Sequence, residues 1–207
     1  DNNGNASMAT ATVTVQDNIA PVALTQNITA QLDSNGEANI DADDIDNGSS
    51  DACGIASRSL DITSFDCSDV GNHTVTLTVT DNNGNESEAT AVVTVEDTMV
   101  PMAVAQNVTV QLDANGNGAT TANAVNDGSS DNCGIASMSL SQTAFDCSHV
   151  GPNTVTLTVT DVNGNVSMAT ATVTVQDNIA PEALAQDITV QLDSNGAASI
   201  DADDIDN

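Results

Sequence analysis

The chain of 207 residues carries 30 acidic residues against a single Lys or Arg, which is Arg58, and its formal net charge is −29. Nucleic acids and anionic membranes are excluded as partners, because proteins bind phosphate through Lys and Arg, and no run of residues predicts direct membrane insertion. Aromatic residues make up only 1% of the chain. A core this thin needs help from disulfides or bound metal.

Landmarks recur with a period of 80 residues, since Asp1 to Asn5 reappears at 81 and 161 and Pro21 reappears at 101 and 181. Residues 161–207 match residues 1–47 more closely than 81–127, so a longer period of 160 overlies the first. The period predicts two complete repeats, 20–99 and 100–179. We expect 1–19 to be the C-terminal part of a preceding repeat and 180–207 the N-terminal part of a following one.

Within 20–99 the predicted elements are strands joined by turns. Alternation at Ile28 to Leu32 predicts the first strand, and the turn 33–36 leads to a second that runs toward Ile45. A short strand is expected from Cys53 to Ile55. The clearest strand is 74–80, and the Gly84 turn joins it to a last strand that buries its valines. The further expected core residues are Leu60, Ile62, Phe65, Ala91, Val93 and Val95.

Short strands at this spacing, with no helical period, predict an all-β fold. The fold class is a series of tandem immunoglobulin-like β-sandwich repeats of about 80 residues in an elongated array. The acidic run of Asp41, Asp43, Asp44 and Asp46 is interpreted as the solvated face of a strand.

Each complete repeat has two cysteines at a constant spacing, 67 − 53 = 14 and 147 − 133 = 14. An even, repeated count predicts one disulfide per repeat, Cys53–Cys67 and Cys133–Cys147. Buried free thiols are the alternative, and a zinc site is disfavoured because neither histidine recurs. Disulfides imply an oxidising, extracellular setting.

Several of these segments together resemble hyalin-type (HYR) repeats, most closely the tandem copies in very large surface proteins of Bacteroidota. The resemblance lies in Pro21, 27–29, 48–55, 65–71, 75–81, 84–85 and 93–97, and in 130–134 and 145–151 of the second repeat. It implies an extracellular module used in adhesion or as a spacer, located on the bacterial cell surface. It carries over no catalytic residues.

Calcium (Ca2+) is the predicted structural cofactor, because it takes six to eight oxygen ligands from carboxylates, amides and carbonyls. We expect each linker, the loop before the first cysteine and the Gly-Asn loop to meet at one end of a repeat. The first predicted ligand set is Asp17, Asp46, Asp51, Asp81, Asn83 and Asn85. The second is Asp97, Asp127, Asp131, Asp161 and Asn163, with Asp177 in the third linker. Ordinary turn formation by Asp, Asn and Gly is the alternative.

Glycans are a further candidate partner. Sequons are present at Asn5, Asn27, Asn47, Asn72, Asn85, Asn107 and Asn165. Thr98 lies in a triplet, 97–99, that resembles the O-glycosylation signal of Bacteroidota.

The residues satisfy no catalytic constellation, so the chain is not expected to be an enzyme. We expect a spacer or stalk of a giant bacterial surface adhesin, rigidified by calcium and disulfides, whose partners are neighbouring repeats. One alternative is a subunit of an extracellular filament, in which identical chains associate as a fibre. The other is a carbohydrate- or protein-binding module, which the lack of aromatic clusters disfavours.

Overall fold

The computed structural model describes residues 2–206, which form two compact, sheet-based units. The first unit comprises Asp1–Val104, Gly128–Met138 and Thr158–Met168, and the second comprises Ala105–Asp127, Ser139–Leu157 and Ala169–Asn207. The first unit therefore contains all of the repeat at 20–99 together with three segments from the repeat at 100–179, namely 100–104, 128–138 and 158–168. Within 2–206 no helix has both the length and the hydrophobicity needed to cross a membrane.

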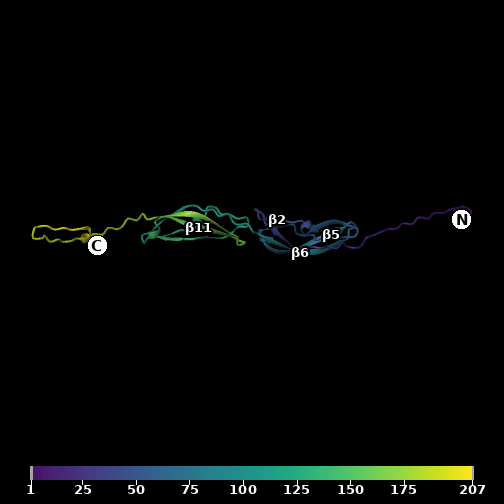
Figure 1. Cartoon of the computed structure of the whole chain (residues 1–207), viewed down its shortest axis with the longest axis horizontal. Helices are drawn as coiled ribbons and strands as arrows, with labels where there is room; N and C mark the ends of the chain where they lie inside the picture. The colour runs from purple at the N-terminus through teal and green to yellow at the C-terminus, as the bar shows by residue number, and fades with distance from the viewer. Residues whose placement is uncertain (1, 207) are drawn as a thin grey trace. The chain divides into compact units, whose positions relative to one another are not determined.

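The repeat at 20–99 is all-β and has two sheets (Figure 1). The larger sheet has the order β1 (Ile28–Gln31), β6 (Glu86–Glu96), β5 (Gly71–Asp81), β3 (Ile55–Leu60). β1 is parallel to β6, and the other neighbours are antiparallel. The smaller sheet pairs β2 (Glu37–Asn39) with β4 (Ser64–Asp66). The strand predicted to begin at Cys53 in fact begins at Ile55.

The alternating sequence of β5 explains its place at the centre of the larger sheet. Val75, Leu77 and Val79 are completely buried, while the threonines between them are partly exposed. The antiparallel register sets Val75 opposite Ala91 of β6. β-branched residues suit such a pleated, half-buried surface. The predicted strand at 74–80 is confirmed and is longer than expected.

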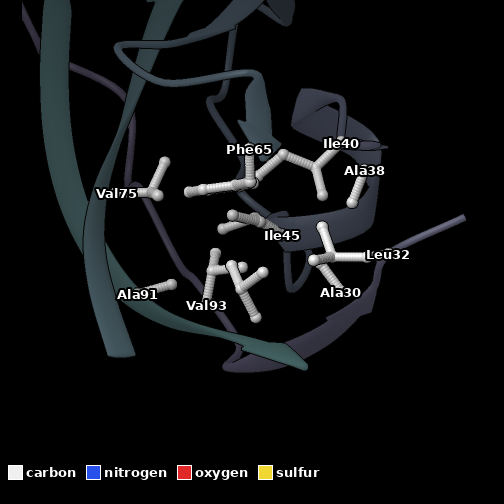
Figure 2. Packing of buried hydrophobic residues seen from close by; sticks show 10 residues of the cluster. Ala30, Leu32, Ala38, Ile40, Ile45, Phe65, Val75, Ala91 and Val93 are labelled. Atoms are coloured by element: carbon white, nitrogen blue, oxygen red, sulfur yellow. The ribbon is translucent and has the colours of Figure 1, made fainter. Parts of the chain in front are cut away.

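The core lies between the two sheets and is small. Figure 2 shows the side chain of Ile45 in the middle of the cluster, with Phe65 on one side and Val93 on the other. Ile45 is completely buried, and Phe65 of β4 is 4% exposed. With one aromatic ring in this cluster, burial alone gives the repeat little stability.

Short helices are present where none was expected, at α1 (Ala42–Ile45), α2 (Ala122–Val125) and α3 (Ala202–Ile205). The interpretation of the acidic run as a strand face is wrong. Asp41 caps α1 by accepting the N–H of Asp43 at 2.9 Å, and its own N–H donates to the Asp44 carboxylate at 2.9 Å. This reciprocal capping stabilises one helical turn, which directs Ile45 into the core. Single 3-10 turns follow at η1 (Cys67–Asp69) and η2 (Cys147–His149).

The repeat at 100–179 has the same strand order. Its larger sheet is β7 (Val108–Gln111), β12 (Val166–Gln176), β11 (Gly151–Asp161), β9 (Ile135–Leu140), and its smaller sheet pairs β8 (Asn117–Ala119) with β10 (Ala144–Asp146). One packing detail differs, because Val110 and Gly118 replace Ala30 and Ala38. A Cβ on Gly118 would lie 2.6 Å from Val110 Cγ1, so the larger valine fills the space that the glycine leaves.

The segments 2–20 and 180–206 contain no named strand. The second of them nevertheless repeats the local hydrogen bonds of the complete repeats. Gly196 N–H donates to Asp193 O as Gly36 N–H donates to Asp33 O, and α3 has the same capping box as α1. These turns therefore depend on local sequence rather than on the sheets.

Candidate metal centre and its disulfide

The disulfide pairing predicted from the sequence is wrong. Cys67 is bonded to Cys133, whereas Cys53 and Cys147 are free and exposed. Cys53 lies beside the end of β5, where its carbonyl accepts the Asn82 side chain at 2.7 Å, and Cys67 precedes the start of β5. The eleven residues of β5 span roughly 35 Å, far beyond the Cα separation of about 7 Å that a disulfide allows.

The bonded cysteines lie against a tight turn at 33–36. Gly36 has a φ of +76°, and a Cβ there would lie 2.5 Å from Cys67 Sγ and 3.2 Å from the carbonyl oxygen of Asn132. The Asn132 side chain donates to Asp33 O at 3.1 Å. Glycine is therefore required at position 36, both for its conformation and because the 131–134 loop approaches so closely.

Three carboxylates gather next to this loop. One oxygen from each of Asp97, Asp131 and Asp161 lies within 4.8 Å of the other two. Asp97 follows β6, Asp161 ends β11, and Asp131 begins the loop before β9. Asp97 is 7% exposed and Asp161 is 1% exposed. The structure thus brings together three of the residues predicted for the second calcium site.

Backbone hydrogen bonds fix the orientation of all three carboxylates, and Asp97 Oδ1 accepts the N–H of Met99 at 3.1 Å. Asp161 Oδ1 accepts the N–H groups of Asn163 at 2.9 Å and Asn165 at 2.8 Å, while Oδ2 accepts the Asn165 side chain at 2.9 Å. Asp131 Oδ2 accepts the N–H of Cys133 at 2.8 Å. The Gly-Asn loop and the cysteine loop therefore hold their acidic residues rigidly, as a preformed cation site requires.

Two oxygens near these carboxylates lack a hydrogen-bond partner. Asp97 Oδ2 and Asn132 Oδ1 are both buried and unpaired. The Asn132 amide nitrogen lies 3.4 Å from Asp97 Oδ1, so the two side chains are adjacent. Buried acceptors are nearly always satisfied, and carboxylate and amide oxygens are ligands that Ca2+ prefers. The donor set therefore fits a hard divalent cation.

The negative charges of the three carboxylates also favour a bound divalent cation. Carboxylates this close repel each other by roughly 3 kcal/mol per pair at a protein's effective dielectric. The chain's one Lys or Arg, Arg58, is paired elsewhere, 3.2 Å from Asp46 and 3.6 Å from Asp43. A bound cation would relieve the repulsion among Asp97, Asp131 and Asp161.

The corresponding end of the repeat at 20–99 has a weaker group, made of Asp17 from the preceding linker with Asp51 and Cys53, whose ligand atoms also lie within 4.8 Å of one another. A hydrogen bond and the negative charge of Asp17 raise the pKa of the Cys53 thiol. Asp81 is buried but lies outside this group. Burial works to raise the pKa of Asp81, but hydrogen bonds from Asn85 and the rest of its loop hold it below the usual value.

The remaining predicted ligands are not brought into either group. Asp46 pairs with Arg58 and accepts the N–H of Ser49 at 3.0 Å, so its predicted role as a ligand is wrong. Asp127 and Asp177 are exposed. Asn83 and Asn163 donate backbone N–H groups to the buried aspartates, and Asn85 and Asn165 also donate side-chain amides. They orient carboxylates, whereas Asn132, which the sequence analysis missed, offers an oxygen.

The sequon asparagines stay predicted glycosylation sites, and several have structural contacts. The amide nitrogen of Asn85 donates to Asp81, and that of Asn165 donates to Asp161. Asn27 Oδ1 accepts the N–H of Val92 at 2.8 Å. Thr98 donates to Gln31 at 3.0 Å. A glycan would replace one of the two amide hydrogens of Asn85 or Asn165 and leave the other to donate to Asp81 or Asp161.

The sequence matches no protein-family model and no curated protein. Among solved structures, it is similar to the protocadherin GammaB4 extracellular domain, with a TM-score of 0.37 and 18% identity over 83% of this chain and 35% of that chain. Mouse cadherin-23 EC22-24 has a TM-score of 0.37 and 14% identity over 76% of this chain and 65% of that chain. The fibronectin(III)-like modules of Clostridium thermocellum CbhA have a TM-score of 0.26 and 12% identity over 76% of this chain and 92% of that one. The chain spans about a third of the protocadherin structure, and similarity at this level assigns no function.

Proposed function

We propose that this chain is part of an extracellular array of immunoglobulin-like repeats that serves as a spacer or stalk in a large bacterial surface adhesin. In this proposal, tension along the chain is carried by the disulfide, and calcium holds the 131–134 loop in place. The resemblance to hyalin-type repeats supports the surface location. A disulfide also fits an oxidising, extracellular setting.

The observation that carries the proposal is the position of the Cys67–Cys133 bond. The bond closes a loop of chain that contains β5 and β6, the two longest strands of the repeat at 20–99. A pulling force applied at the two ends of the chain passes through the bond and bypasses these strands. Such an arrangement protects the centre of the sheet under load, which suits a spacer better than a binding module.

Calcium supplies the second part of the proposal. Asp97, Asp131 and Asp161 are the expected carboxylate ligands, and Asn132 Oδ1 is the expected amide ligand. The cation would offset the repulsion among the three charges. It would also tie the segment after β6 to the loop before β9, next to the disulfide.

Calorimetric titration with Ca2+ tests the metal site, with Asp97→Asn as the variant and Asp177→Asn as its matched control at the exposed equivalent position. We expect D97N to weaken the tightest site at least tenfold and D177N to leave it unchanged. Without calcium, D97N should be as stable as the parent chain or more so, because one repelling charge is gone. Equal affinities for the parent chain and D97N would contradict the site.

Single-molecule pulling tests the mechanical role. With the bond intact, the 66 residues from Cys67 to Cys133 cannot extend, so complete unfolding should release about 220–240 Å less chain than it does after reduction. Cys147→Ser should behave like the parent chain, and Cys133→Ser should behave like the reduced chain under all conditions. The mechanical proposal fails if reduction does not change the extension.

A further inference from the structure

The disulfide and the candidate metal centre share one loop. Asp131 and Asn132, which offer oxygens to the cation, come directly before Cys133, which is bonded to Cys67. All of these residues belong to the first compact unit. Consecutive residues of one short loop do not move independently, so whatever holds the loop for the bond also holds it for the cation.

Asn132 contacts both the sulfur atoms and the carboxylates. Its carbonyl oxygen lies 3.6 Å from Cys67 Sγ. Its amide nitrogen lies 3.4 Å from Asp97 Oδ1 and 3.6 Å from Cys133 Sγ, and it donates to Asp33 O at 3.1 Å. A displacement of Asn132 would therefore disturb the bond and the cation site together.

Asp131 depends on the same loop for its orientation. Its Oδ2 accepts the N–H groups of Cys133 at 2.8 Å and Gly134 at 3.1 Å. The other two carboxylates of the cluster, Asp97 and Asp161, lie outside the loop, after β6 and at the end of β11. The cation site is therefore complete only while the loop is held beside those two residues.

The disulfide supplies that placement. Cys67 lies against the turn at 33–36 and fastens Cys133 there. Reduction leaves the hydrogen bond from Asn132 to Asp33 O, which is far weaker than a covalent link. In the reduced chain the loop must lose conformational freedom when a cation binds. The oxidised chain has already lost that freedom, so it should bind Ca2+ more tightly.

We propose that calcium protects the Cys67–Cys133 bond from reduction, because the cation and the disulfide hold the same loop. This inference rests on the calcium site of the proposed function and adds a regulation to it. Linkage is reciprocal, so the factor by which the bond tightens calcium binding is also the factor by which saturating calcium disfavours reduction. We expect a factor of about 10, which corresponds to a reduction potential lower by about 30 mV. A stalk would keep its covalent link where calcium is plentiful and lose it to a reductant where calcium is scarce.

The reduction is a thiol–disulfide exchange, for which dithiothreitol serves as the reductant. One of its thiolates attacks the protein bond to give a mixed disulfide, and its second thiolate then closes a ring and releases the protein. The protein bond breaks, one bond forms in the cyclic disulfide, and two protons pass from dithiothreitol to Cys67 and Cys133. The ratio of cyclic to reduced dithiothreitol therefore sets the equilibrium.

The experiment equilibrates the full chain in such a mixture, with Ca2+ or with EDTA at an ionic strength matched by KCl. The chain carries Cys53→Ser and Cys147→Ser, so that one pair of cysteines reacts, and alkylation followed by mass spectrometry measures its reduced fraction. At ten times the Kd of the oxidised chain, calcium should raise the ratio of oxidised to reduced chain about fivefold. With Asp97→Asn added, which leaves the loop unchanged, the rise should be less than about twofold.

The reciprocal measurement is calorimetric titration with Ca2+ of Cys67→Ser, which removes the bond from outside the loop, in the presence of a reductant. Its affinity should be about tenfold weaker than that of the oxidised chain. Tight calcium binding to the oxidised chain with no change in the redox ratio would overturn the linkage and leave the calcium site standing. A rise of the same size in D97N would also overturn it. Absence of calcium binding to the oxidised chain would overturn both the linkage and the site.

Discussion

The loops 51–54 and 131–134 have nearly the same sequence but differ in their bonding and in their surroundings. In the second loop, Cys133 is bonded to Cys67, and Asp131 joins two buried carboxylates. In the first loop, Cys53 is free and exposed, and Asp51 meets one other carboxylate and a thiol. The sequence of the loop alone therefore determines neither the disulfide nor the carboxylate cluster. The turn at 33–36 and the cysteine at position 67 must be supplied to it.

The two loops also differ in how well they are covered. Asn132 and Cys133 are partly buried, whereas Ala52 and Cys53 are exposed. Asn132 contacts Asp33 and Asp97 through its amide, and alanine at position 52 offers no such contact. The bonded loop is therefore the better defined of the two, and changes made in it should have larger effects.

The largest expected effect comes from removing the bond. Cys67→Ser should lower the free energy of unfolding by roughly 4 kcal/mol, because the bond closes a loop between residues separated by 66 positions. Cys147→Ser changes an exposed thiol in the equivalent position and should cost less than about 0.5 kcal/mol. Urea denaturation of both variants measures the difference. Equal losses would show that the two cysteines are equivalent after all.

The second-largest expected difference between the two loops is in the stabilisation that calcium gives. At a calcium concentration of 100 times Kd, binding should stabilise the parent chain by about 2.7 kcal/mol. Asp131→Asn should lose most of this gain, and Asp51→Asn should keep it, since the group at Asp51 offers fewer oxygen ligands. Thermal melts with calcium and with EDTA check the prediction. A gain that survives in D131N, or disappears in D51N, would place the tight site elsewhere.

The cores of the two repeats offer a third comparison. Gly118→Ala should cost about 1–3 kcal/mol, because the added Cβ would overlap Val110 Cγ1. The double variant with Val110→Ala reproduces the pair Ala30 and Ala38 and should recover most of the loss. Denaturation of the single and double variants measures this coupling. Simple additivity of the two changes would show that these positions do not share space.

The smallest expected effect concerns a hydrogen bond whose acceptor is a charged carboxylate in the first repeat and a neutral hydroxyl in the second. The Asp61 carboxylate accepts the N–H of Thr76 at 2.7 Å, and this bond holds the pKa of Asp61 below its usual value. Ser141 accepts the equivalent N–H of Thr156 at 2.9 Å without a charge. Because Asp61 is exposed, Asp61→Ala should cost only about 0.5 kcal/mol at pH 7.

The pH dependence follows from the direction of that pKa shift. A carboxyl whose pKa is lower in the folded state contributes stability above its unfolded pKa, and the contribution is lost as the pH falls through the folded value. Asp61→Ala and the parent chain should therefore converge as the pH falls from the usual aspartate pKa of 3.8 through the lower pKa of the folded state, whereas Ser141→Ala should show the same difference at every pH. A constant difference for D61A would mean that charge has no part in the contact.

Much of the fold could be predicted from the sequence because its strands alternate strictly. The alternation of Val75, Leu77 and Val79 predicts a central strand, and the Gly84 turn predicts the hairpin that follows it. Helix α1 was missed because its four residues are too few to show a period. The capping pair Asp41 and Asp44 was the one signal for it, and clustered acidic residues also suit a solvated surface.

The site could be predicted only in part. Asp97, Asp131 and Asp161 were found because acidic loop residues recur in each repeat. The disulfide was missed because a period of 80 and a spacing of 14 also give a spacing of 66 between Cys67 and Cys133, and the sequence does not choose between the two. The choice depends on β5, which separates Cys53 from Cys67, and that separation exists only in the folded chain.

The most direct test of the account is a tryptic digest without reductant. Arg58 is the only Lys or Arg, so trypsin cuts the denatured chain once, between Cys53 and Cys67. The account predicts that fragments 1–58 and 59–207 separate freely on a non-reducing gel, each with one free thiol, and that the larger fragment contains the Cys67–Cys133 bond. Fragments that stay joined until a reductant is added would contradict it.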